Sequence, residues 1–156
     1  MISRWRSIDW HDDRGQMGGF EAIPFGLLIF VVGALLVANA WAVIDTKMAA
    51  QSAAREATRT YVESGDPLHA RADADIAAAE AIGAYGRDPA KLRLDGPASP
   101  TELQRCNRIT FTASYPVPAL SLPWIGGFGD GFTVKASSSQ IVDPYREGLS
   151  GEADCG

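Results

Sequence analysis

The chain contains an uninterrupted run of uncharged residues from Ala22 to Ile44, and this run limits what the chain can fold into. Asn39 is the only strongly polar side chain among its 23 residues. As an α-helix rising about 1.5 Å per residue, the run is roughly 34 Å long, and the hydrocarbon core of a bilayer is about 30 Å thick. We therefore predict a single transmembrane helix, because a wholly soluble globular protein rarely carries such a run.

Two other interpretations of the run fit less well. The apolar core of a cleaved secretory signal peptide has about 7–15 residues, and a buried helix of a globular protein is rarely apolar on every face. Pro24 in the first turn and Trp41 near the far end both suit a membrane helix. Basic residues flank the run equally, so orientation is predicted from size and cysteine usage instead. We expect the short N-terminal segment in the cytoplasm and the large C-terminal part outside.

The charge of the outer part excludes one class of ligand. Residues 45–156 hold 11 Lys and Arg against 15 Asp and Glu, so this part is mildly acidic. Nucleic-acid-binding domains usually carry a basic patch. Nucleic acid is therefore not expected as a main ligand.

Helix-forming residues continue beyond the apolar run. Ala, Gln, Glu and Arg are frequent up to residue 63, and Ser64-Gly65-Asp66-Pro67 is a stop signal. One helix is therefore predicted over residues 21–64. A second helix is expected from about residue 66 to residue 85. Its predicted apolar stripe consists of Leu68, Ala72, Ile76, Ala79 and Ile82.

After residue 89 the pattern becomes one of strands. Residues 91–95, 107–115 and 132–142 alternate or are rich in strand-forming residues. In the middle segment one face is predicted to carry Ile109, Phe111, Ala113 and Tyr115. Three short strands need a helix to pack against, and the protruding half of the first helix can supply it.

The segment between the last two strands is predicted to be a loop, because it holds three prolines and four glycines. It also holds the large apolar residues Trp124, Ile125 and Phe128. Such residues mark either a contact with a membrane or partner, or a lid over the small core.

The predicted fold class is α+β, in which a long N-terminal transmembrane helix extends into an extracytoplasmic domain with a second helix and a small antiparallel sheet. We divide the chain into a cytoplasmic leader-like segment (1–20), a transmembrane and stalk helix (21–64) and an extracytoplasmic domain (65–156).

The two cysteines, Cys106 and Cys155, both fall in the outer part. An even pair in an extracytoplasmic domain suggests a disulfide, and two unpaired thiols are the alternative. Closing a loop of about 50 residues would add roughly 4 kcal/mol of stability in the chain-entropy model.

The sequence predicts that the protein has no metal site, uses no cofactor and is not an enzyme. Neither cysteine has a second ligand at C-x-x-C spacing, and His69 is the only histidine of the outer part. A serine or cysteine nucleophile would have only this imidazole as its base. We expect His69 to be a solvated side chain.

Glu21 is the one charged residue at the threshold of the apolar run, and it has two interpretations. In the first, its carboxylate caps the N-terminus of the helix, where the helix dipole favours negative charge. Alternatively, the charge lies where subunits meet and pairs there with a cation.

Several segments together resemble a known family. They are Asp13-Arg14-Gly15, Phe20-Glu21 before the apolar helix, Ala53-Ala54-Arg55-Glu56-Ala57, and the strand pair at 109–118 and 132–137. In this order and spacing the chain resembles the TadE-like pilus assembly proteins, and most closely their actinobacterial members. These are minor pilins, or pseudopilins, of the tight adherence (Flp, type IVc) system. The resemblance covers roughly residues 13–145.

The resemblance implies a mechanism and partners. A prepilin peptidase would remove a short leader on the cytoplasmic side, within the region Gly15, Gln16, Met17, Gly18 and Gly19. Glu21 would then pair with the amine of a neighbouring subunit during assembly. The implied partners are the major Flp pilin, other TadE- or TadF-like pseudopilins and membrane platform proteins.

The family's usual spacing places the glutamate fifth in the mature chain, which puts the cut after Gln16. The alternative is an uncleaved, single-pass, membrane-anchored binding or scaffold protein that presents the Trp124 loop to an envelope partner.

Overall fold

The structure of the chain, a computed structural model, describes residues 22–118, 120–122, 126–128, 131–152 and 154–155. The chain divides into two compact units, Met1–Ala38 and Asn39–Gly156. The division falls inside the first described helix, α2 (Ala22–Glu63), whereas the predicted extracytoplasmic domain begins at residue 65. The reason is that the later part of α2 supplies buried side chains to the second unit.

The two long helices lie close to the predicted ranges. α2 ends at Glu63, one residue before its predicted end. The second helix, α3 (Ala70–Ala84), begins about four residues later than predicted. The Asp66 carboxylate accepts a hydrogen bond from the backbone N–H of Leu68 at 2.9 Å, so it stabilises a turn that precedes the helix.

The apolar stripe predicted for the second helix is wrong at Leu68 and Ile76 and right at Ile82, which is fully buried. Leu68 and Ile76 are 76% and 58% exposed. The buried positions of α3 recur every four residues and are mostly alanine: Ala70, Ala74, Ala78 and Ile82. α3 therefore buries three alanines and Ile82 and leaves Ile76 in contact with solvent, and the exposed Leu68 lies in the turn before the helix.

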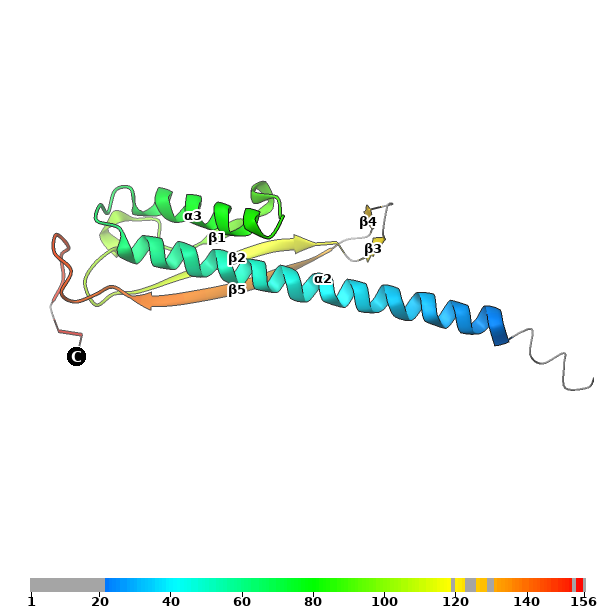
Figure 1. The fold of residues 1–156 in the computed structure, drawn as a ribbon. Helices are drawn as coiled ribbons and strands as arrows, with labels where there is room; N and C mark the ends of the chain where they lie inside the picture. Colours follow the sequence, from blue (N-terminus) through cyan, green and yellow to red (C-terminus); the bar gives the residue numbers. More distant parts are fainter. Residues whose placement is uncertain (1–21, 119, 123–125, 129–130, 153, 156) are drawn as a thin grey trace, which may run out of the picture. The chain divides into compact units, whose positions relative to one another are not determined.

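Three strands form an antiparallel sheet in the order β1-β2-β5: β1 (Arg93–Asp95), β2 (Arg108–Val117) and β5 (Phe132–Ile141). β2 and β5 pair over ten residues, from Arg108 opposite Ile141 to Val117 opposite Phe132. β1 is shorter than predicted, because Pro89–Lys91 form a 3-10 turn instead of a strand. Figure 1 shows the sheet and α3 beside the later part of α2.

The segment predicted to be a loop contains a short hairpin. β3 (Leu120–Leu122) pairs antiparallel with β4 (Gly126–Phe128), with Leu120 opposite Phe128. The dense prolines and glycines of this segment obscured a strand of only three residues on each side.

The core lies between the sheet and the two helices. Ile109, Phe111, Ala113 and Tyr115 of β2 are all buried, which confirms the predicted inner face of this strand. The ring of Tyr61 on α2 meets the ring of Phe111 edge-on, with centroids 5.4 Å apart. The described fold is thus α+β, with a long apolar N-terminal helix, a second helix and a small antiparallel sheet.

Candidate functional site: an apolar helix that continues into an alanine face

The early part of α2 exposes its large apolar side chains. Phe25, Phe30 and Val37 are 65%, 73% and 71% exposed. The most apolar 18-residue window of α2 has a mean hydropathy of 2.6 and is 0% buried. Among the described residues, this one helix is long and apolar enough to cross a membrane. Because burying a large apolar side chain is favourable by about 1.5–3 kcal/mol, this surface strongly favours an apolar surrounding over water.

The later part of α2 has a different buried surface, which we call the alanine face. It consists of Ala49, Ala50, Ala53, Ala54 and Ala57, each 0% exposed. These residues belong to one hydrophobic core with the buried alanines of α3 and the inner face of β2. A single helix therefore combines an outward apolar surface with a surface that packs inside its own domain.

Polar side chains also connect α2 to strand β5. The Gln51 amide donates to the carbonyl of Ser137 at 3.2 Å. The Thr58 hydroxyl lies 3.2 Å from the carbonyl oxygen of Ser138, but its one proton has a closer acceptor in the carbonyl of Ala54 within α2, at 2.6 Å. The Lys47 ammonium donates to the carbonyl of Lys135. These bonds fix α2 along the strand in addition to the apolar contacts.

Both ends of this later part of α2 are held by arginines. Arg87, which follows α3, pairs with Asp45 at 2.5 Å. Arg146, near the C-terminus, donates to the carbonyls of Val62 and Glu63, the first at 2.9 Å. Carbonyls in the last turn of a helix have no partner within the helix, so Arg146 acts as a C-terminal cap of α2.

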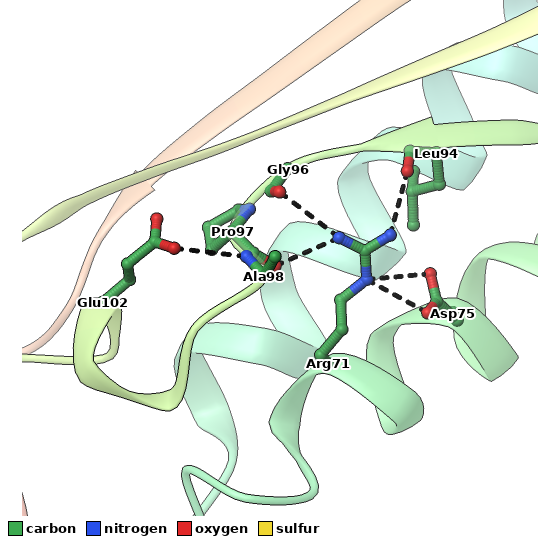
Figure 2. Close-up of polar contacts among 7 residues, drawn as sticks. All are labelled: Arg71, Asp75, Leu94, Gly96, Pro97, Ala98 and Glu102. Carbon is green, nitrogen blue, oxygen red and sulfur yellow. Dashed lines mark hydrogen bonds and ion pairs between the residues drawn. The ribbon is translucent and has the colours of Figure 1, made fainter.

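Arg71 of α3 lies at the centre of a polar cluster that sequence reasoning missed (Figure 2). Its guanidinium donates to three backbone carbonyls of the segment after α3: Leu94 at 2.9 Å, Gly96 at 3.3 Å and Pro97 at 3.0 Å. Its Nε also pairs with both carboxylate oxygens of Asp75, at 3.1 and 3.0 Å. The spacing of Arg71 and Asp75, four residues apart on a helix, was the available signal.

Two aromatic rings lie against this cluster. The guanidinium carbon of Arg71 is 5.5 Å from the centroid of Phe111, within the range of a cation–π contact. The Tyr61 hydroxyl donates to the carbonyl of Ser99 at 3.3 Å. Burial raises the pKa of this hydroxyl, the nearby Glu102 carboxylate raises it further, and Arg71 opposes both effects.

The polar contacts of this cluster hold parts of the fold together. Glu102 accepts hydrogen bonds from the N–H groups of Ala98, at 3.2 Å (Figure 2), and Ser99, at 3.1 Å, so its carboxylate closes the turn that runs from Ala98 to Glu102. The Arg71 nitrogens are all committed to carbonyls or to Asp75. The arrangement holds α3 to the sheet.

The two cysteines are joined in the structure. The sulfur atoms of Cys106 and Cys155 lie 2.03 Å apart, and the Cα atoms lie 5.1 Å apart, in agreement with the predicted disulfide. Cys106 has a φ of 63°, an unusual value for a residue with a side chain. The C-terminal segment is also held by a hydrogen bond from the N–H of Arg105 to the carbonyl of Ser150 at 2.9 Å.

His69 is exposed, as expected, but it has a partner. Its Nδ1 lies 2.6 Å from Oδ2 of Asp66, and its side chain is 72% exposed. The hydrogen bond to Asp66 raises the pKa of His69, and the negative charge of Asp66 adds to the effect. Within the described residues, no group of three His, Cys, Asp or Glu side chains is placed to bind a metal ion.

The remaining residues singled out in the sequence lie outside what the structure describes. These are Glu21, the leader region Gly15, Gln16, Met17, Gly18 and Gly19, and the loop residues Trp124 and Ile125. Phe128 belongs to β4 by its backbone, opposite Leu120. The assembly, cleavage and partner-loop roles predicted for these residues therefore stay predictions.

Comparison of the chain with protein-family models, with curated proteins and with solved structures finds no match.

Proposed function

We propose that the chain is a structural minor pilin, or pseudopilin, of a tight adherence type IVc pilus or secretion system. In this proposal the N-terminal helix anchors it in the cell membrane with a short cytoplasmic N-terminus and an extracytoplasmic C-terminal domain. The protein helps to initiate or assemble the pilus and does not catalyse a reaction. Its partners are the major Flp pilin, other pseudopilins and the platform proteins of the membrane.

One observation carries the proposal: α2 is a single helix with two different surfaces. Its early part exposes apolar side chains such as Phe30, and its later part buries the alanine face in the core of its own domain. A helix of this kind can leave lipid for a protein bundle without unfolding the domain, because both surroundings accept apolar side chains. The family resemblance of residues 13–145 supports the same role.

Glu21 is the proposed assembly residue. A carboxylate at the edge of an apolar helix is costly in lipid unless it finds a cationic partner. The free amine that a prepilin peptidase would create on a neighbouring subunit is such a partner. Cleavage within residues 15–19 is therefore part of the proposal.

The first test is the intact mass of the protein extracted from its native membrane. Removal of the leader predicts a mass that lacks about 15–19 N-terminal residues, the range that the family resemblance gives. The full mass would instead favour the alternative function, a permanent membrane anchor that presents a binding domain.

The second test replaces Glu21 in cells that assemble the pilus. Glu21→Ala is expected to abolish assembly, measured as pili sheared from the cell surface, and Glu21→Asp to retain part of it. The matched control is Glu80→Ala, which removes an exposed carboxylate of α3. The amount of each variant in the membrane is measured in parallel. Normal assembly by Glu21→Ala at normal membrane levels would refute the assembly mechanism.

A further inference from the structure

A groove of about 420 Å³ lies on the later part of α2, where α2 meets the end of α3. It is lined by two cationic side chains, several polar ones and two with apolar surface: Lys47, Met48, Gln51, Ser52, Arg55, Glu56 and Tyr85. Met48 and Tyr85 are 56% and 42% exposed, so the groove is open to its surroundings. The structural contacts described above do not account for this combination of cations with apolar surface.

The cations of the groove have donors to spare. The Lys47 ammonium has three donors, and the structure uses one of them for the carbonyl of Lys135. Within the described part of the chain, the Arg55 guanidinium makes no hydrogen bond or ion pair. Glu56 is the one anion of the groove, and its carboxylate pairs with Arg59 at 3.4 Å on the neighbouring turn. The groove therefore favours an anionic ligand.

The position of the groove along α2 indicates where that anion comes from. Lys47 lies three residues beyond Ile44, which is about 4.5 Å of helix. The headgroup layer of a bilayer is roughly 5–7 Å thick on each side, so Lys47 falls within it when residues 22–44 span the hydrocarbon core. Arg55 lies about 16 Å beyond Ile44, outside the headgroup layer. Its side chain leans toward the N-terminus of the helix, which here is the direction of the membrane, so Arg55 acts through its charge.

The apolar lining fits the same ligand. A tyrosine suits the interface between lipid and water, because its ring is apolar and its hydroxyl is polar. Met48 adds a flexible apolar surface beside Lys47. A phospholipid presents both a phosphate anion and the start of its acyl chains at this depth.

We propose that this groove binds the headgroup of an anionic glycerophospholipid from the leaflet that faces the outer domain. Lys47 and the Tyr85 hydroxyl bind the phosphodiester, and Arg55 adds positive charge from above. The site holds the domain against the membrane surface. This inference rests on the membrane-spanning role of residues 22–44 and not on pilus assembly, which the Glu21 variants test separately.

The test measures lipid binding to the full chain in nonionic detergent by native mass spectrometry. The probes are phosphatidylglycerol, which is anionic, and phosphatidylcholine, which has no net charge. We expect tighter binding of phosphatidylglycerol. Arg55→Gln and Lys47→Gln are each expected to weaken that binding about fivefold, the contribution typical of one basic residue near an anionic lipid surface. Glu56→Gln is expected to strengthen it.

Two controls separate a built site from general charge attraction. Lys91→Gln removes an exposed cation outside the groove and is expected to leave binding unchanged. Lys47→Arg keeps the charge and is expected to retain binding. Near-UV circular dichroism checks the fold of each variant. If Lys47→Gln disturbs the domain, Arg55→Gln tests the site instead, because Arg55 makes no hydrogen bond or ion pair within the described residues.

Three results would overturn the proposal. The first is equal binding of the two lipids. The second is a loss with Lys91→Gln as large as that with Arg55→Gln, which would indicate only a diffuse charge effect. The third is displacement of phosphatidylglycerol by inorganic phosphate at equal concentration, which would indicate a site for a free anion and not for a lipid.

Discussion

The Arg71 cluster makes the stability of the second unit, Asn39–Gly156, depend on one partly exposed side chain, and this dependence can be measured. Arg71 donates to the carbonyls of Leu94, Gly96 and Pro97 and lies over the ring of Phe111. A hydrogen bond to a charged group contributes about 1.5–3 kcal/mol when it is well buried. The Arg71 side chain is 30% exposed, so water replaces part of what a substitution removes. We therefore expect Arg71→Gln to lower the free energy of unfolding by about 2–4 kcal/mol.

Two further variants separate the parts of this effect. Asp75→Asn removes only the ion pair on the helix surface, and such pairs contribute about 0.3–0.5 kcal/mol. Arg71→Lys keeps the positive charge but lacks the planar group that reaches three carbonyls at once, so its cost is expected to lie between those of the other two variants.

The assay is urea unfolding of the full chain in a mild nonionic detergent, followed by near-UV circular dichroism. This signal reports the packing of aromatic rings such as Tyr61 and Phe111 in the core. Arg71→Gln costing no more than Asp75→Asn would refute the reasoning, because the carbonyl bonds would then contribute nothing measurable.

Three further predictions concern single sites. Gly96→Ala places a Cβ atom 2.4 Å from an atom of the Phe111 ring and should lower the free energy of unfolding by about 1–3 kcal/mol in the same urea assay. Gly65→Ala, whose Cβ would meet nothing within 4 Å, should be tolerated, and equal effects of the two variants would contradict the contact. Cys155→Ser, or reduction of the native protein, should cost up to about 4 kcal/mol, and an unchanged urea midpoint would argue against the disulfide. Asp66→Asn should lower the pKa of His69 toward its ordinary value, measured by NMR titration of the imidazole, and an unchanged His69 pKa would contradict the pairing. Because the pKa of His69 is raised in the folded protein, its contribution to stability is present at pH below the unfolded pKa and is lost as the pH rises through the folded pKa.

The elements with a strong pattern could be predicted from the sequence. The apolar run and the helix formers after it placed α2 to within a residue at its end. The alternation of Ile109, Phe111, Ala113 and Tyr115 gave the buried face of β2, because a half-buried strand shows its burial directly in its sequence.

The face of α3 could not be predicted in the same way. The helix is rich in alanine on every side, so the large residues Leu68 and Ile76 dominated the pattern and indicated the wrong face. What decides the burial of α3 is its fit against the alanine face of α2 and the sheet, and that fit depends on residues distant in the sequence.

The Arg71 cluster escaped sequence reasoning for a related reason. Its acceptors are backbone carbonyls more than 20 positions away, and carbonyls leave no trace in a sequence. Only the pair with Asp75 is local. Glu21, the residue with the strongest predicted role, lies outside the described residues, and its role stays a prediction.

The hydrogen bonds from helix side chains to strand carbonyls have a consequence for crowded copies of the chain. A sheet with an unpaired edge strand can pair with a strand of another molecule and grow into an aggregate. Here β5 and β1 are the two edge strands of the three-stranded sheet. Lys47 and Gln51 of α2 donate hydrogen bonds to carbonyls of β5, and Arg71 of α3 donates to a carbonyl of β1. Side chains of the two helices thus occupy part of each edge of this sheet, which disfavours pairing with a strand of a neighbouring molecule.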